Sequence, residues 1–128
     1  MFGTDIGFLL YWLANAVQVI PPYPTAVLNA WNWSFLSLDL LAAGTGLASL
    51  HMARRRHRGA AMVRAVSLAL THAAGLLAIN FWALRCEFDP AWWLPNLWLV
   101  LFPIAALVST VRQHAQPEPP TRQQTTLA

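Results

Sequence analysis

Three residues, Asn32, Asp39 and Gly46, stand seven positions apart in a stretch of the sequence that is otherwise strongly apolar. In a helix this spacing places all three on one stripe. A carboxylate in such a stretch can carry a proton, pair with a cation or accept hydrogen bonds, because burying it ionised and unpaired is costly. A small residue such as Gly46 on the same stripe would let a neighbouring helix approach closely. Asp39 is therefore the strongest candidate for chemistry.

Two further polar residues are expected at a similar depth. His72 stands near the middle of another apolar run and can become a cation, and Asn15 is a neutral donor in the first run. We expect Asp39, His72 and Asn15 to form a polar cluster, with Asn32 nearer the outside, that binds a small ligand or relays a proton. The alternative is that these side chains only hydrogen-bond neighbouring helices and fix their packing.

The elements that must position these residues are long apolar runs. The chain is 57% hydrophobic and 10% charged, with a mean hydropathy of +0.45, whereas about a quarter of the residues in a soluble domain are charged. Runs of about 20 apolar residues without alternation are typical of transmembrane helices. We expect an all-α polytopic membrane protein, a four-transmembrane-helix bundle over residues 1–112, with helices at about 5–20, 30–52, 62–84 and 92–111. Residues 113–128 are expected to form a disordered cytoplasmic tail.

Several residues predict where these helices begin and end. The cluster Pro21-Pro22-Tyr23-Pro24 should stop the first helix, and Thr25 could cap the second. Pro103 lies inside the fourth run and predicts a kink. The first run is expected to be retained, since a signal peptide begins with basic residues and this stretch carries Asp5 instead.

Arginine placement predicts the orientation. Arg54, Arg55, Arg56 and Arg58 lie between the second and third runs, and more arginines follow the last run on the same side. The positive-inside rule then puts both termini and this loop in the cytoplasm. The same arginines could also attract anionic lipid headgroups, although setting the topology is a sufficient role for them.

Other function classes lack support in the sequence. Cys86 is the single cysteine and the histidines have no metal-ligand spacing, so neither an intramolecular disulfide nor a metal site is expected. Nucleophile elbows, phosphate-binding loops and dinucleotide fingerprints are not found. The arginines sit in a short connector rather than along a groove-sized face, which argues against nucleic acid. We therefore expect no catalytic residues, no cofactor and no enzyme activity.

Two blocks of the sequence resemble the YvaD-like family of small, uncharacterised bacterial membrane proteins. The first block is Asp5–Trp12 with the Pro21-Pro22 turn, and the second is Ala30–Phe35, followed by Leu38-Asp39-Leu40 and Thr45-Gly46-Leu47. Members of that family often have proline where this chain has Ser37, and a longer first loop. The resemblance implies a four-helix protein of the bacterial cytoplasmic membrane, and it assigns no activity and no role to any residue.

Two functions remain open at this stage. One is the binding or transport of a small ligand or a proton at the cluster around Asp39. The other is an accessory or interaction subunit of a membrane complex, in which the polar stripe only packs helices together. The expected partners are the lipid bilayer and either further copies of the chain or a membrane partner protein.

Overall fold

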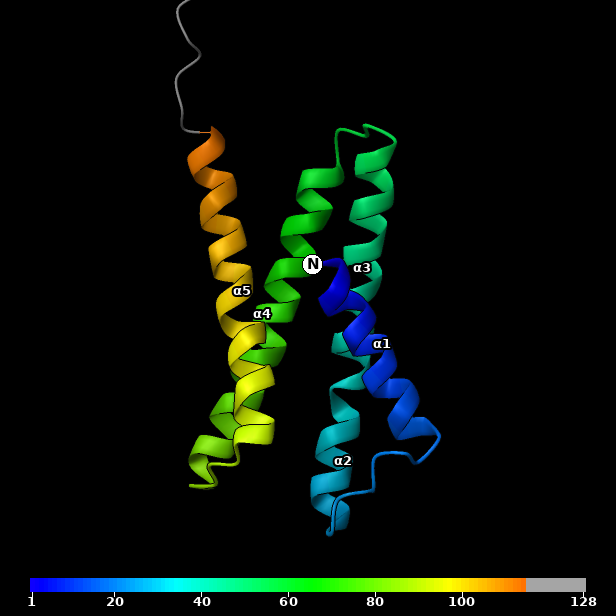
Figure 1. Cartoon of the computed structure of the whole chain (residues 1–128), viewed down its shortest axis with the longest axis vertical. Helices are drawn as coiled ribbons and strands as arrows, with labels where there is room; N and C mark the ends of the chain where they lie inside the picture. The colour runs from blue at the N-terminus through cyan, green and yellow to red at the C-terminus, as the bar shows by residue number, and fades with distance from the viewer. Residues whose placement is uncertain (115–128) are drawn as a thin grey trace, which may run out of the picture.

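The computed structural model describes residues 1–114, and all its regular elements are helices: α1 (Phe2–Ala16), α2 (Ala26–Ser34), α3 (Leu36–Arg54), α4 (Ala60–Leu84) and α5 (Pro90–His114). Helices α2 and α3 are interrupted only at Phe35 and follow one another as a single long rod (Figure 1). The all-α prediction is confirmed for these residues. The predicted tail, 113–128, lies outside the described residues except for its first two positions, which belong to α5.

Three stretches are long and apolar enough to cross a membrane: Ala26–Arg54, Ala60–Leu84 and Pro90–Gln113. Helix α1 has 15 residues, or about 22 Å at 1.5 Å per residue, and so falls short of the roughly 30 Å hydrocarbon core. The predicted first span, 5–20, is therefore not confirmed as a full crossing. Helix α1 ends at Ala16, and the chain turns back through Gln18, whose φ is 57°.

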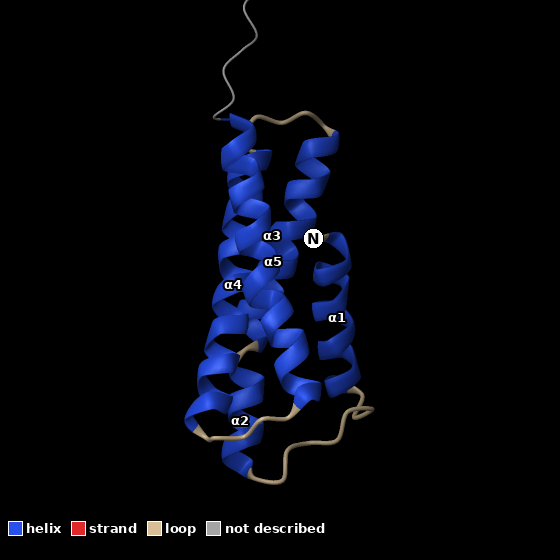
Figure 2. Ribbon diagram, turned by 60° about the vertical axis from the view of Figure 1, so that its left-hand side comes forward, coloured by secondary structure: helices blue, strands red, loops and turns tan. Residues whose placement is uncertain are grey.

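The helices pack side by side in the order α1, α3, α4, α5, with α2 continuing the line of α3. Within the described chain, backbone contacts join α1 to α3, α3 to α4 and α4 to α5. Side chains bring the two ends of this row together, because Leu99 of α5 packs against a buried cluster of Phe8, Ala42 and Ala43 from α1 and α3. Figures 1 and 2 show α1 beginning about halfway along the molecule. The loop between α3 and α4 and the end of α5 lie at one end, and the other two connections lie at the opposite end.

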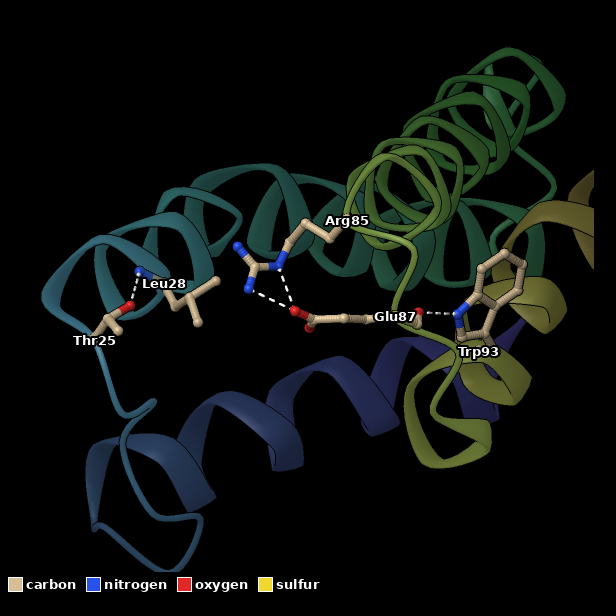
Figure 3. Close-up of polar contacts among 5 residues, drawn as sticks. All are labelled: Thr25, Leu28, Arg85, Glu87 and Trp93. Atoms are coloured by element: carbon tan, nitrogen blue, oxygen red, sulfur yellow. Dashed lines mark hydrogen bonds and ion pairs between the residues drawn. The ribbon is translucent and has the colours of Figure 1, made fainter.

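Short polar contacts fix the end of the molecule away from the arginine loop (Figure 3). Thr25 caps α2 by accepting a hydrogen bond from the Leu28 N–H at 3.3 Å, as predicted from the sequence. In the turn between α4 and α5, Arg85 pairs with Glu87 at 2.6 Å, and the Trp93 indole donates to the Glu87 carbonyl at 3.0 Å. These contacts hold the ends of α4 and α5 together at that turn.

Helix α5 runs through Pro95 and Pro103 without a break in its assigned helix. Pro103 is fully buried, and it has no N–H to donate to the carbonyl of Leu99. Helix α4 comes close to α5 beside Leu99, because a Cβ built on Gly75 would lie 2.7 Å from the Leu99 Cβ and 2.8 Å from the Asn96 carbonyl oxygen. The glycine therefore sets the distance between α4 and α5 beside the two prolines.

Candidate functional site

The stripe formed by Asn32, Asp39 and Gly46 faces α1 along its whole length. All three residues are buried, although the helix is interrupted at Phe35 between the first two. On α1, Tyr11 and Asn15 hydrogen-bond with Asn32. Trp12 hydrogen-bonds with Asp39, and Asp5 lies against Gly46. Since α1 and α3 run in opposite directions, Trp12 pairs with Asp39 and Asp5 pairs with Gly46, each pair seven residues from the other.

Asp39 is held by a single hydrogen bond. The Trp12 indole N–H donates to its Oδ2 at 2.9 Å, and its Oδ1 is buried with no partner among the described residues. The residue is 6% exposed and lies near the middle of the Ala26–Arg54 stretch. One carboxylate oxygen is therefore oriented by the protein, while the other is buried and has capacity for a hydrogen bond that no described residue fills.

Asn32 anchors a second polar group about two helical turns from Asp39. The Tyr11 hydroxyl donates to its side-chain oxygen at 2.8 Å, and its amide nitrogen donates to the Asn15 side-chain oxygen at 3.3 Å. Asn15 in turn donates to the Tyr11 carbonyl at 2.9 Å. This chain of bonds satisfies Asn32 and joins α2 to α1.

A pocket of about 810 Å³ opens beside Asp39 and Asn32, between α1 and α5, and we call it the central pocket. All five helices contribute to its wall, with α1, α2 and α3 on one side and α4 and α5 on the other. Its volume lies within the range typical of small-molecule sites. A long bond of 3.4 Å from the Trp98 indole to the Thr4 hydroxyl links α5 to α1 across it.

The wall of the central pocket is rich in aromatic residues, which make up nine of the 21 residues that line it. Five of the seven tryptophans of the chain line it: Trp12, Trp31, Trp82, Trp92 and Trp98. Tyr23, from the loop between α1 and α2, adds a ring that lies 5.6 Å from Trp92. Its hydroxyl is buried and has no partner in the described part of the chain. Burial raises the pKa of the Tyr23 hydroxyl, so this group stays protonated and able to donate.

The structure separates the residues predicted to form one cluster. Asp39 and Asn32 line the central pocket, whereas Asn15 bonds to Asn32 but lines a smaller recess near the end of α1. His72 lies in the middle of α4, and its Nδ1 is 3.0 Å from the Val100 carbonyl oxygen of α5. The predicted contact between His72 and Asp39 is thus replaced by a contact with α5, because α4 presents this residue to α5 rather than to α3.

The four predicted loop arginines, Arg54, Arg55, Arg56 and Arg58, are all exposed around the turn between α3 and α4. The same turn contains a left-handed residue, Arg56, with φ of 53°. The ion pair seen in residues 1–114 lies at the opposite end of the molecule, between Arg85 and Glu87. The loop arginines are therefore open to solvent, which suits either a topology signal or contact with lipid headgroups.

Sequence reasoning missed two members of the α1–α3 interface. Trp12 was not identified as the donor to Asp39, and Asp5 was not identified as a member of this interface. Asp5 is 1% exposed, and its carboxylate oxygens would lie 2.5 Å from a Cβ built on Gly46. The signal was present, because Asp5, Phe8 and Trp12 fall on one helical face. The spacing of seven between Asp5 and Trp12 matches that between Asp39 and Gly46.

Comparisons with known proteins agree with the resemblance noted in the sequence. The uncharacterized protein YvaD of Bacillus subtilis (strain 168) is 40% identical over 107 residues, which cover 79% of this chain and 80% of YvaD. No solved structure matches the chain. A model of a family of unknown function, DUF5360, matches residues 1–117. That match spans both sequence blocks and every described helix, and the chain therefore belongs to the DUF5360 family.

Proposed function

We propose that this protein is an integral protein of the bacterial cytoplasmic membrane that binds a small, largely aromatic ligand in the central pocket, with Asp39 as the polar anchor. The observation that carries the proposal is the state of Asp39. Its carboxylate is buried in the pocket wall, one oxygen is oriented by Trp12, and the other has no partner among the described residues. An unsatisfied buried acceptor is costly, and a ligand that donates to it would remove that cost.

The membrane assignment is supported by the three apolar stretches and by the bacterial origin of the relative. Helix α1 would then enter the bilayer as a fourth, shorter helix beside α3. The exposed arginine loop would face the cytoplasm together with the end of α5. Cys86, which is exposed in the turn between α4 and α5, would face outward.

This topology can be tested on intact cells with a membrane-impermeant maleimide. Cys86 should be labelled in the unmodified protein, because its turn lies on the outer side. The matched variant carries Cys86→Ser together with Arg56→Cys, which moves the thiol to the arginine loop and should abolish labelling until the cells are permeabilised. Labelling of the Arg56→Cys variant in intact cells would reverse the proposed orientation.

Ligand binding can be tested with triphenylmethanol, which offers three aromatic rings and one hydroxyl donor. The purified full chain in phosphatidylcholine nanodiscs should show a saturable change in tryptophan emission, since five of its seven tryptophans line the pocket. The Ala78→Phe variant should lose this change, because Ala78 is buried in the pocket wall. The control is Ala69→Phe, which adds the same ring at an exposed position of the same helix.

Thermal unfolding of both variants separates filling of the pocket from misfolding. Saturable binding by the unmodified protein and by Ala69→Phe, with loss in a folded Ala78→Phe, supports the proposal. Absence of saturable binding to the unmodified protein contradicts it. A signal that survives in Ala78→Phe also contradicts it, because the probe would then bind elsewhere.

The second candidate is an accessory or interaction subunit. It is favoured by one feature, the exposure of one face of α5, on which large apolar side chains such as Leu94, Leu101 and Ile104 are exposed. A partner helix, or another copy of this chain, could cover that face. Leu101→Trp should then disrupt the complex in a cross-linking experiment without affecting binding of triphenylmethanol.

A further inference from the structure

The central pocket contains the parts of a site for an organic cation. Its aromatic rings meet at steep angles as well as in parallel pairs. Trp31 and Trp82 lie 5.8 Å apart with their planes at 83°, while Trp82 and Trp92 are stacked at 6.1 Å. Rings that meet at a corner present several electron-rich faces to one volume, which is the arrangement that recognises quaternary ammonium groups.

The charges around the pocket favour the same kind of ligand. Asp39 is its acidic side chain, and none of the lining residues in the described chain is an arginine, a lysine or a histidine. The single basic group that could reach the wall is the amino group of Met1, at the end of the pocket near Thr4. An anionic ligand would meet Asp39 without a compensating side-chain cation, whereas a cationic ligand would offset the cost of ionising a buried carboxylate.

The two polar atoms without partners in the pocket wall set where the charge would lie. The Oδ1 of Asp39, buried without a partner, belongs to the α3 side, and the ring that carries the buried Tyr23 hydroxyl lies 6.3 Å from Trp82 and 5.6 Å from Trp92. A cation beside Asp39 would place its aromatic substituents among the tryptophans. The Trp12 indole donates a hydrogen bond to the Asp39 carboxylate and fixes its orientation, so the site is formed before the ligand binds.

We propose that the central pocket selects lipophilic organic cations, meaning ammonium or phosphonium compounds with aromatic substituents, with the positive charge beside Asp39 and the aromatic groups between the tryptophans. This inference rests on the proposed function, because it names the class of ligand for the same pocket. It goes further in that a neutral ligand of the same shape should bind more weakly.

The test compares two probes of the same shape and different charge: methyltriphenylphosphonium, a cation, and 1,1,1-triphenylethane, its neutral isostere. Both are titrated against the full chain in phosphatidylcholine nanodiscs, with empty nanodiscs subtracted. We expect the unmodified protein to bind the cation about tenfold more tightly, as a partly desolvated charge contact would give. Asp39→Asn should abolish this preference. Asp5→Asn is the matched control, since Asp5 is buried in the same interface but outside the pocket, and it should keep the preference.

The outcomes distinguish this inference from the proposed function. Equal affinity of the two probes for the unmodified protein, or a preference that persists in Asp39→Asn, overturns the selection of cations. In that case binding of triphenylmethanol and triphenylethane still supports the pocket as a ligand site. Loss of all saturable binding, including that of triphenylmethanol, contradicts the proposed function itself. Retained binding of the neutral probe by Asp39→Asn shows that this variant is folded. If the variant does not fold, the ratio of the affinities of the unmodified protein for the two probes decides whether the pocket selects cations.

Discussion

The interfaces on the two sides of the central pocket are both built on a buried glycine, but they differ in which groups lie beside it. In both, a buried glycine lets two helices approach: Gly46 between α1 and α3, and Gly75 between α4 and α5. The space at Gly75 is taken by backbone and by Leu99, and the nearby His72 reaches a carbonyl of α5. The space at Gly46 is taken by the carboxylate of Asp5, and Asp39 lies two turns away with a free oxygen. Among the described residues, the α4–α5 interface has no buried side-chain polar atom without a partner, whereas the α1–α3 interface retains one unpartnered oxygen on each of Asp5 and Asp39.

The largest effect should come from closing the gap at Gly75. In Gly75→Ala the new methyl group would meet the Asn96 carbonyl oxygen and the Leu99 backbone, neither of which can rotate away. We expect α4 and α5 to separate, at a cost of about 1–3 kcal/mol in the free energy of unfolding. The measurement is unfolding of the purified protein in mixed micelles with increasing dodecyl sulfate.

Gly44→Ala is the matched control for that substitution, because nothing lies within 4 Å of a Cβ at this exposed position in α3. It should leave stability unchanged or raise it by up to about 1 kcal/mol, as expected for alanine in place of glycine inside a helix. If Gly75→Ala and Gly44→Ala have the same stability, the close packing of α4 on α5 is refuted.

A Cβ added at Gly46 would meet the Asp5 side chain rather than backbone, so the loss of stability in Gly46→Ala should depend on Asp5. Gly46→Ala should destabilise the protein by about 1–2 kcal/mol when Asp5 is present, because its buried carboxylate must move. Combined with Asp5→Ala, the same substitution should cost much less. A double-mutant cycle in unfolding experiments should give a coupling energy of about 1 kcal/mol between the two positions. Additive effects would show that Asp5 does not pack on Gly46.

The polar stripe was predictable from the sequence, but its partners were not. Spacing alone places Asn32, Asp39 and Gly46 on one face, and this holds through the interruption at Phe35. Which helix meets that face depends on how α1 and α4 are rotated, and spacing within one helix carries no information on that rotation. His72 illustrates the limit, since its depth is near the middle of α4 as predicted and its direction is toward α5.

The end of α1 at Ala16, rather than near residue 20, could not be predicted for a different reason. Helices α1, α3 and α4 are each followed by a residue with positive φ, namely Gln18, Arg56 and Cys86. Glycine usually marks this position, because other residues adopt a left-handed conformation at some cost. With no glycine there, apolar composition extended the predicted helix to residue 20. The order in which the helices pack was equally unpredictable, since four apolar runs of spanning length do not specify which helices are neighbours.

A smaller effect is expected from the hydrogen bond that orients Asp39. Trp12→Phe keeps the ring packing and removes the 2.9 Å bond to the carboxylate, which should cost about 1 kcal/mol of stability and weaken binding of methyltriphenylphosphonium. Trp98→Phe is the control for stability, because Trp98 is 58% exposed and its bond to Thr4 is 3.4 Å long. Equal loss of stability in the two variants would argue that the Trp12 indole does not hold Asp39 in place.

The smallest effect should come from His72, and it separates a packing residue from a binding residue. His72→Phe removes the contact with the Val100 carbonyl, and interhelical hydrogen bonds in membranes are worth about 0.6 kcal/mol on average. Because His72 does not line the central pocket, the preference for the cationic probe over its neutral isostere should be unchanged. If His72→Phe instead abolished that preference as Asp39→Asn is expected to do, the two interfaces would act as one polar system. The distinction between a satisfied interface and a binding interface would then be lost.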